Sequence, residues 1–451
     1  MKHWIFKAGW LALACATAGM GAAAQQPLTL RQAIDQALGA NPEARQAGAA
    51  AREAKARASL ARTALIPQLN FTEDIARGDD PVYVFGAKLR QQAFTQADFA
   101  MNALNRPQPL GNFATRLSGQ WLAFDSFQTQ KKIRAAGRMR QSAESSAKAV
   151  NQKIVLDVVT AYQSVLYAER QVAVARQELD TAEALLASAN DHVKAGLAVE
   201  SDRMSAEVNV AARRQEEIAA QGGLEMAWAQ LRTAMGAPDL PETTLAPLAP
   251  HGFPQTALDA ELQTAYKTRP DLAALGQAQS AQAEAVSAAK SGFGPRISAY
   301  GNWEQDRPTF AGPGGNNWVA GVQLTIDIAP FAKRAQFEDE RAARDVVDAQ
   351  MTTYRQQMQL QVTEAHIALQ TAELSQKTAQ AALTQSAESL RILRNRYRAG
   401  LATITDLLRA EDAERESQNN YWRAVYSNAV AYAQLLYATG TLTPDAAEEL
   451  Q

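Results

Sequence analysis

The sequence contains the same motif twice. Ala-Gly-Leu-Ala stands at residues 195–198 and again at residues 399–402, and the match continues to Asp202 and Asp406. Two upstream prolines recur in the same way, Pro42 with Pro270 and Pro67 with Pro295. A unit of about 200 residues is far longer than a solenoid repeat and indicates the duplication of a half-protein. We therefore predict two structural repeats within one body.

Composition excludes several classes of protein. The 451 residues carry a net charge of −2, so the basic footprint of a nucleic-acid-binding protein is missing. The four histidines are far apart, without metal-ligand spacing, and Cys15 is the only cysteine. No nucleophile–base set, paired-carboxylate site or phosphate loop stands out. We expect no enzyme, no cofactor and no metal site.

The first 24 residues resemble an export signal. Lys2 and Lys7 flank the start, an apolar stretch follows, and three alanines at residues 22–24 offer a cleavage site. A membrane anchor and a lipoprotein modified at Cys15 are the alternatives. Beyond residue 24 no apolar run is long enough for a transmembrane helix. An exported chain of this kind is either soluble outside the cytoplasm or a β-barrel in an outer membrane.

Each repeat has the same predicted order of elements. The first repeat spans residues 25–240 and the second residues 255–440, joined by a linker at 241–254 and followed by a peripheral tail at 441–451. In both, a helix is interrupted by a proline, whose ring clashes with the preceding turn. A second helix, a β-hairpin and a very long helical hairpin follow.

The predicted strands alternate with a period of two. The hairpins occupy residues 66–125 and 295–328, with strands of about ten residues, the length that crosses a bilayer when tilted. A soluble hairpin packed on helices is the alternative. Two hairpins cannot close a barrel alone, but several chains together can. The loop at residues 78–112 is much longer than its counterpart, and its mixed composition predicts a structured segment of unassigned role.

The long helices are predicted at residues 129–194 and 333–398, each about 100 Å long at 1.5 Å per residue. Apolar residues recur at alternating spacings of four and three, which is typical of a coiled-coil seam. In the first helix these residues are Ile154, Val158, Ala161, Val165, Ala168 and Val172. After each Ala-Gly-Leu-Ala turn a returning helix is predicted, at residues 201–235 and 403–438.

Together these features resemble the TolC-like family of outer-membrane efflux ducts. The most specific stretch is residues 396–411, with its earlier copy, and the interrupting Asn41-Pro42 and Arg269-Pro270-Asp271 elements also fit. The resemblance implies an α+β membrane protein. Three chains would each give four strands to one twelve-stranded β-barrel in the outer membrane, continued by a long periplasmic α-helical barrel.

The resemblance also implies partners and a passive role. A homotrimer in outer-membrane lipid would receive substrates from a periplasmic adaptor and an inner-membrane pump, either proton-driven or of the ABC type. The chain would conduct, while the pump supplies the energy, in tripartite efflux or type I secretion. The alternative is an exported coiled-coil scaffold or adaptor of the envelope without a pore.

Two groups of residues match functional positions of the family. The tip residues would dock the adaptor, although glycine also suits any tight helix reversal; they are Gly196, Leu197, Gly400 and Leu401. The periplasmic aperture would involve Asp202, Tyr397, Asp406 and Arg409. Thr403-x-x-Asp406 equally resembles a helix capping box, and Tyr397 could simply pack. Ala402 and Arg409 depart from the family pattern, so an acidic cation-binding ring is not expected.

Overall fold

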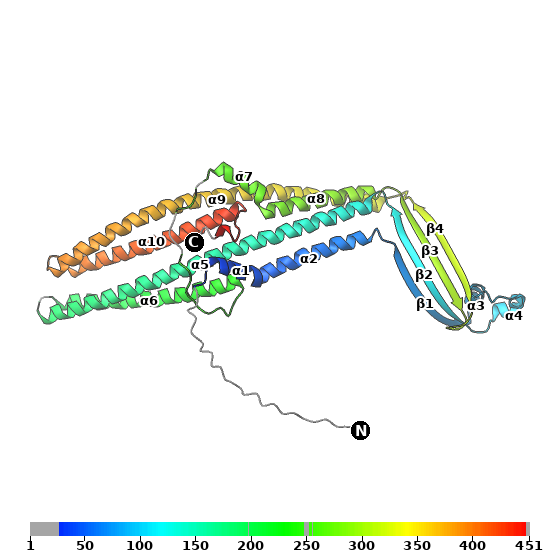
Figure 1. Cartoon of the computed structure of the whole chain (residues 1–451), viewed down its shortest axis with the longest axis horizontal. Coiled ribbons are helices and arrows are strands. Elements are labelled where there is room, and N and C mark those ends of the chain that lie inside the picture. The colour runs from blue at the N-terminus through cyan, green and yellow to red at the C-terminus, as the bar shows by residue number, and fades with distance from the viewer. Residues whose placement is uncertain (1–26, 197, 248–251, 255, 448–451) are drawn as a thin grey trace, which may run out of the picture.

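The structure, a computed structural model, describes residues 27–196, 198–247, 252–254 and 256–447. The predicted signal peptide and Cys15 lie outside the described residues, as does Leu197. The described chain is an elongated helical body with one β-sheet at its end (Figure 1). The sheet bends away from the axis of the helices.

The helices follow the same order in both halves of the chain. The first half contains α1 (Leu30–Ala40), α2 (Pro42–Thr63), α5 (Gln128–Lys194) and α6 (Glu200–Met235). The second half contains α7 (Leu258–Thr268), α8 (Pro270–Ser291), α9 (Phe331–Arg398) and α10 (Ile404–Ala438). The 67 residues of α5 and the 68 of α9 are each about 100 Å long. Among the described residues, no helix has an apolar stretch suited to crossing a membrane.

Local signals set the boundaries of the short helices. Thr29 and Gln32 form a capping box at the start of α1. Asn41 ends α1 and caps α2, where its side chain accepts a hydrogen bond from the amide of Glu43 and Pro42 occupies the first helical position. Gly236, at the end of α6, lies against Asn41, and a Cβ there would stand 2.7 Å from the Asn41 Cα. These contacts confirm the predicted break at Asn41-Pro42.

The four strands form one antiparallel sheet in the order β1-β2-β3-β4. They are β1 (Gln68–Gly78), β2 (Leu110–Phe124), β3 (Arg296–Arg307) and β4 (Gly315–Thr325). β2 pairs with β3, so the two predicted hairpins join into a single sheet. Within each hairpin the register is continuous, from Gln68 opposite Gln120 to Gly78 opposite Leu110 in the first.

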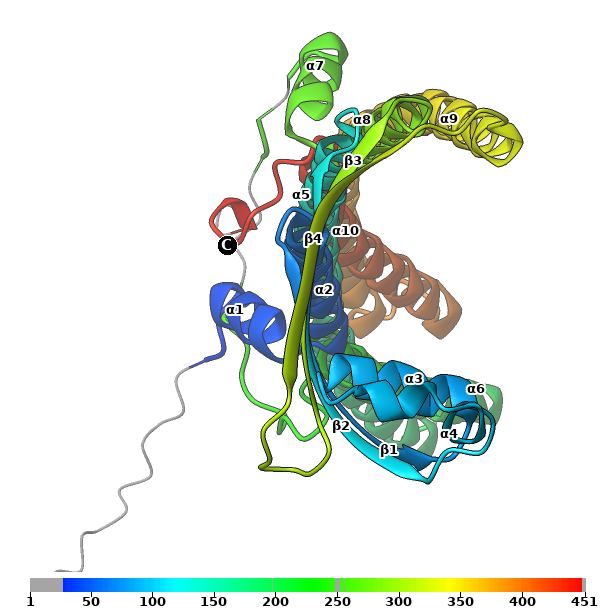
Figure 2. The ribbon, with the colours of Figure 1, turned by 90° about the vertical axis from the view of Figure 1, so that its right-hand side faces the viewer.

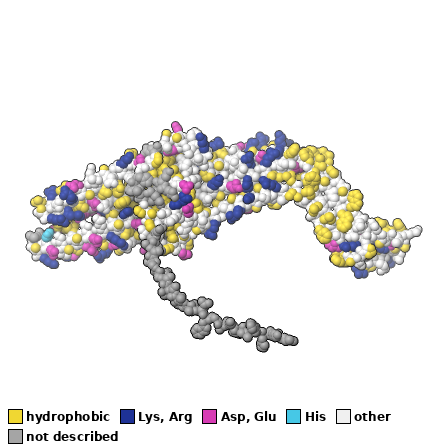
Figure 3. Space-filling model, in the orientation of Figure 1, with side chains coloured by type: hydrophobic (Ala, Val, Ile, Leu, Met, Phe, Trp, Pro, Cys, Tyr) yellow, Lys and Arg dark blue, Asp and Glu magenta, His cyan; other side chains and the backbone are white. Residues whose placement is uncertain are grey.

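The two faces of the sheet differ in polarity. One face carries large exposed apolar side chains, namely Leu69, Phe71, Ile75, Trp318, Val322 and Leu324. The other carries mainly polar ones, including Asp74, Asn112, Arg116, Asn302, Glu304 and Asn317. The period-two alternation read from the sequence is therefore confirmed. Hydrophobic side chains gather over the sheet and the adjoining helix ends, whereas charges are spread along the helical body (Figure 3).

The long loop of the first hairpin is structured, as predicted. It contains α3 (Pro81–Arg90), the 3-10 helix η1 (Gln96–Phe99) and α4 (Met101–Asn105). Asp80 caps α3 by accepting a hydrogen bond from the amide of Tyr83. Seen from the end that carries the sheet, the strands form a curved wall, and α3 and α4 lie on its concave side (Figure 2).

Two separate apolar cores are found among the described residues. The larger one joins α1, α5, α6, α7, α9 and α10 near the middle of the helical body and contains the predicted seam residues Ile154, Val158 and Val362. The smaller one lies at the far ends of the long helices and includes Leu185, Leu390, Ile404 and Leu407. Four helices meet in this tip core, which fixes the position of both turns.

The prediction of a peripheral tail after Gly440 is wrong for its described part. Leu442 and Ala447 are fully buried in the larger core, and Asp445 forms an ion pair with Arg31 of α1. The acidic composition suggested a solvated segment. Burial of the apolar surface of Leu442 and Ala447 instead holds the segment against the helical body.

Candidate functional site: the tips of the helical hairpins

Both tips reverse the chain through a left-handed glycine. Gly196 and Gly400 each have φ of +71°, and a Cβ at either position would meet no atom within 4 Å. At the second tip the amide of Gly400 donates to the Tyr397 carbonyl (3.0 Å) and the amide of Leu401 to that of Arg396 (2.8 Å). This is a Schellman motif, so the backbone conformation, rather than crowding, requires glycine.

Leu401 lies at the second tip, where 68% of its surface is exposed to solvent. Nearby apolar side chains are divided: Leu407 is buried in the tip core, whereas Val199 and Met204, just beyond the first turn, are exposed. The predicted partner residue at the first tip, Leu197, lies outside the described residues.

Asp406 closes a capping box at the start of α10. Its carboxylate accepts hydrogen bonds from the Thr403 amide (3.1 Å) and hydroxyl (2.7 Å), while the Thr403 hydroxyl accepts from the Asp406 amide. The bonds from Thr403, with help from Arg409 and Arg396, lower the pKa of Asp406. Arg409 is exposed one turn further along α10. The capping role is thus observed, and an aperture role would use the same ionised carboxylate.

Tyr397 joins the two helical hairpins. It is half-buried at the end of α9, packs against the tip core, and lies with its ring 6.4 Å from that of His192 on α5. Burial raises the pKa of Tyr397, and the nearby charge of Asp202 on α6 raises it further. Tyr397 and Asp202, predicted from separate copies of the motif, are therefore close together in the folded chain.

A further ionic cluster lies deeper between the hairpins and was missed from the sequence. Arg213 of α6 is buried, and its guanidinium contacts Asp412 of α10 (2.9 Å) and Glu216 (2.7 Å). Arg415 contacts both of these carboxylates, at 3.4 and 3.5 Å. Charges spaced three or four apart on a helix are typical of a solvated face, so the pattern gave no sign that this cluster joins two hairpins.

Glu178 of α5 faces this cluster. Burial and the charges of Glu414 and Glu411 together raise its pKa to about 7, although Arg213 and Arg415 act in the opposite direction. Burial also raises the pKa of Glu411, against the effect of Arg394. The contact between the hairpins therefore contains two carboxyl groups with raised pKa values, and that of Glu178 is close to neutral pH.

The described residues contain no group of three or more His, Cys, Asp or Glu side chains arranged to hold a metal ion. The features found at the tips are instead the exposed Leu401 at a glycine turn, Asp406 in a helix capping box and Tyr397 between the two hairpins. They lie at the ends of the long helices α5 and α9, far from the sheet.

Comparison with known proteins identifies the family. The profile of the outer membrane efflux protein family matches residues 33–237 and 262–441, and the chain belongs to this family. The protein is thus an efflux channel component of the outer membrane, and the family consists of channels rather than enzymes.

Individual relatives agree with this assignment. Outer membrane protein OprJ of Pseudomonas aeruginosa is 26% identical over 396 residues, which cover 86% of this chain and 78% of that protein. The alkaline protease secretion protein AprF of the same organism is 22% identical, covering 85% and 78%. The CmeC outer membrane channel of Campylobacter jejuni has the same fold, with a TM-score of 0.76 at 17% identity over 91% of this chain and 85% of that one.

Proposed function

We propose that the chain is the exit duct of a tripartite efflux or type I secretion system. It conducts substrates passively from a periplasmic adaptor and inner-membrane pump to the exterior. One combination of features carries the proposal. A chain of the outer membrane efflux family holds a sheet with one exposed apolar face at the end of helices about 100 Å long.

The sheet supports assembly into a homotrimer. β1 and β4 are its outer strands, and each has one edge without a strand partner among the described residues. Small barrels have about eight strands, so four cannot close alone. Three copies, each made of two structural repeats, would supply twelve strands, cover all edges and turn the apolar faces of Leu69, Phe71 and Trp318 toward lipid.

The helical tips support docking of the adaptor. Apolar side chains at an exposed turn favour a protein partner, and Gly196 and Gly400 hold that turn in place. In this proposal Leu197 and Leu401 contact the adaptor, while Asp202, Tyr397, Asp406 and Arg409 narrow the periplasmic aperture. The relatives' names include both an outer membrane protein and a protease secretion protein, and the proposal accordingly covers efflux and secretion, with a proton-driven or an ABC pump. Nothing observed favours the scaffold alternative over the duct.

The docking role is tested by a paired substitution. Leu197→Asp with Leu401→Asp should abolish export from a strain that depends on this chain, because a charged tip cannot be buried in an apolar contact. Leu197→Met with Leu401→Met is the control and should retain export. Trimer content is measured in the same membranes by chemical cross-linking.

The possible outcomes separate the two parts of the proposal. Lost export with intact trimers supports docking at the tips, whereas normal export in the aspartate variant would contradict it. If the wild-type chain neither restores export nor forms trimers in outer-membrane fractions, the duct itself is excluded.

A further inference from the structure

The segment of residues 79–109, here called the insert, lies on the polar face of the sheet. α3 contacts β2, β3 and β4, and the insert occupies the concave side of the curved wall (Figure 2). The apolar face on the opposite side is left exposed. If the chain forms the proposed duct, the concave polar face lines its lumen, and the following inference rests on that function.

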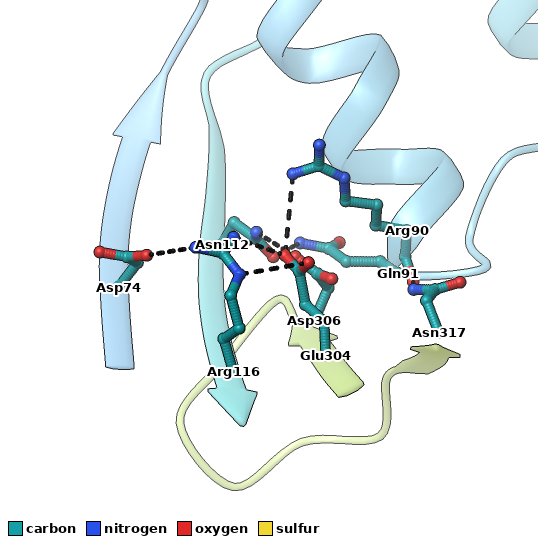
Figure 4. Close-up of polar contacts among 8 residues, drawn as sticks. All are labelled: Asp74, Arg90, Gln91, Asn112, Arg116, Glu304, Asp306 and Asn317. Carbon is teal, nitrogen blue, oxygen red and sulfur yellow. Dashed lines mark hydrogen bonds and ion pairs between the residues drawn. The ribbon is translucent and has the colours of Figure 1, made fainter. Parts of the chain in front are cut away.

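Buried polar side chains attach the end of α3 to this face (Figure 4). The Gln91 amide donates to the Gly111 carbonyl and to the Asn112 side chain, both at 2.9 Å. Asn112 in turn donates to the Asp306 carboxylate at 2.6 Å. All three side chains are at most 6% exposed. Hydrogen bonds of this kind are costly to break, because a buried partner is then left unsatisfied.

A second set of contacts reaches the other strands. The Asn317 amide of β4 donates to the Arg90 carbonyl at 3.2 Å, and Arg90 lies 3.8 Å from Glu304 of β3, which also pairs with Arg116 of β2. Gly315 permits the close approach, since a Cβ there would stand 2.0 Å from the Arg90 carbonyl oxygen. Near the start of α3 the Tyr83 hydroxyl donates to the Ala76 carbonyl of β1. The insert is thus held by all four strands.

The insert carries a group of aromatic residues and several exposed apolar side chains. Phe94 packs edge-on against Phe85 and Phe99, with ring centroids 4.8 and 5.2 Å away. Val82 and Met101 are 81% and 72% exposed. Apolar groups of this size, held over a polar surface, are stabilised when something covers them. In a trimer the covering groups are the inserts of the other two copies, which face the same lumen.

We propose that three inserts converge in the outer mouth of the duct and form an apolar constriction that limits the size of the substrates leaving it. The buried contacts of Gln91, Asn112 and Asp306 hold each insert in this position. An apolar ring of this kind narrows the pore and weakens hydration within it.

The test measures how easily reagents reach the lumen from outside. Gln120 lies on the polar face of β2, ten residues from the insert end of the strand and so about 33 Å away along the strand at 3.3 Å per residue. Cys15 is the only cysteine and lies in the predicted signal peptide, so Gln120→Cys gives a defined thiol. Intact cells are treated with a small maleimide and with the same group on a long polyethylene glycol chain. The ratio of the two labelling rates is the readout.

Two variants in the Gln120→Cys background alter the insert in different ways. One replaces residues 79–109 with a short turn. The other, Gly315→Ala, forces the end of α3 away from β4 without removing any polar group. Gly86→Ala is the control, because this α3 glycine has open space around its Cβ position. The large reagent should react several-fold faster in both variants, with the rate for the small reagent nearly unchanged.

Each result decides between two statements. Equal rate ratios in the parent and Gly315→Ala chains would overturn the constriction, and this holds even if the deletion variant is not recovered. If the small reagent fails to reach Gln120→Cys after deletion of the insert, the polar face is not an open lumen and the proposed duct fails. If the ratio changes as expected, the insert sets the size limit at the exit.

Discussion

Among the described residues, four glycines have positive φ, and they serve the fold in two different ways. Gly196 and Gly400 stand in open space, and only the left-handed backbone requires them. Gly236 and Gly440 combine the same backbone with close packing against the residues before Pro42 and Pro270. The recurrence of both pairs could be read from the sequence. The reason for glycine at each position could not be predicted, because the residues that crowd Gly236 and Gly440 belong to segments distant in the chain.

This distinction predicts an order of stability losses. Gly400→Ala should cost about 1–2 kcal/mol from the left-handed backbone alone. Gly440→Ala should cost more, since its Cβ would stand 2.8 Å from the Arg269 Cα and N atoms. Gly222→Ala, in the open interior of α6, is the control and should gain about 0.5–1 kcal/mol. Thermal midpoints of the purified protein measure the order, and equal midpoints for Gly400→Ala and Gly222→Ala would contradict it.

At the scale of elements, two kinds of contact join the α5–α6 hairpin to the α9–α10 hairpin. Only one of them could be predicted from the sequence. The apolar seam of α5 was visible in its spacing, and Val158 and Val165 are fully buried. The cluster around Arg213 was not visible, because its charges look like an ordinary solvated face until α6 and α10 are brought together. The pairing of β2 with β3 was equally hidden, since neither strand's local pattern specifies a neighbour so far along the chain.

The cluster predicts a pH dependence of the contact between the hairpins. The pKa of Glu178 is about 7 in the folded chain and its ordinary value is 4.5, so the folded state keeps a proton that the unfolded state releases between these pH values. The stabilising contribution of this group is present below about pH 4.5 and is lost as the pH rises through 7.

Glu178→Gln should therefore raise stability by about 1–2 kcal/mol at pH 8 and change it little at pH 4.5. The difference between variant and wild-type unfolding midpoints is measured across this range. Glu183→Gln, an exposed carboxylate on the same helix that pairs with Arg214, controls for the loss of a charge. A Glu178→Gln difference that does not grow with pH would exclude this role.

At the scale of the whole molecule, the sheet has two chemically distinct environments. Val319 and Val322 stand near the middle of β4 on opposite faces, the first with the polar side chains and the second with the exposed apolar ones. In the proposed duct, Val322 meets lipid and Val319 meets the lumen. The two residues therefore form a matched pair for testing the orientation of the sheet.

Val322→Arg should destabilise the assembled protein by about 2–4 kcal/mol, because a cation on the lipid face near the bilayer centre loses its hydration. Val319→Arg should have a much smaller effect, since the lumen supplies water. The yield of folded trimer in outer-membrane fractions and its resistance to denaturant measure both. The opposite order would reverse the assignment of the two faces.

The overall plan of the molecule was more predictable than the folding of its irregular parts. Helix lengths, strand alternation and the tip turns follow from local spacing, proline and glycine. The extra length of the insert was also evident, but its attachment through Gln91 and Asn112 depends on strands that meet only in the sheet. The return of Leu442 to the core was missed for the same reason. Segments without periodicity take their structure from distant contacts.

The division of the interior into two cores has a consequence for how the molecule responds to heat and denaturant. The tip core is small and separated from the main core along α5 and α9, so its loss leaves most buried surface in place. Amide hydrogens near Leu407 and Ala206 should then exchange with solvent through a local opening of low free energy. Those near Val158 should exchange only when the whole protein unfolds. The helical ends thus form a cooperative unit of their own, able to loosen and re-form while the rest of the protein stays folded.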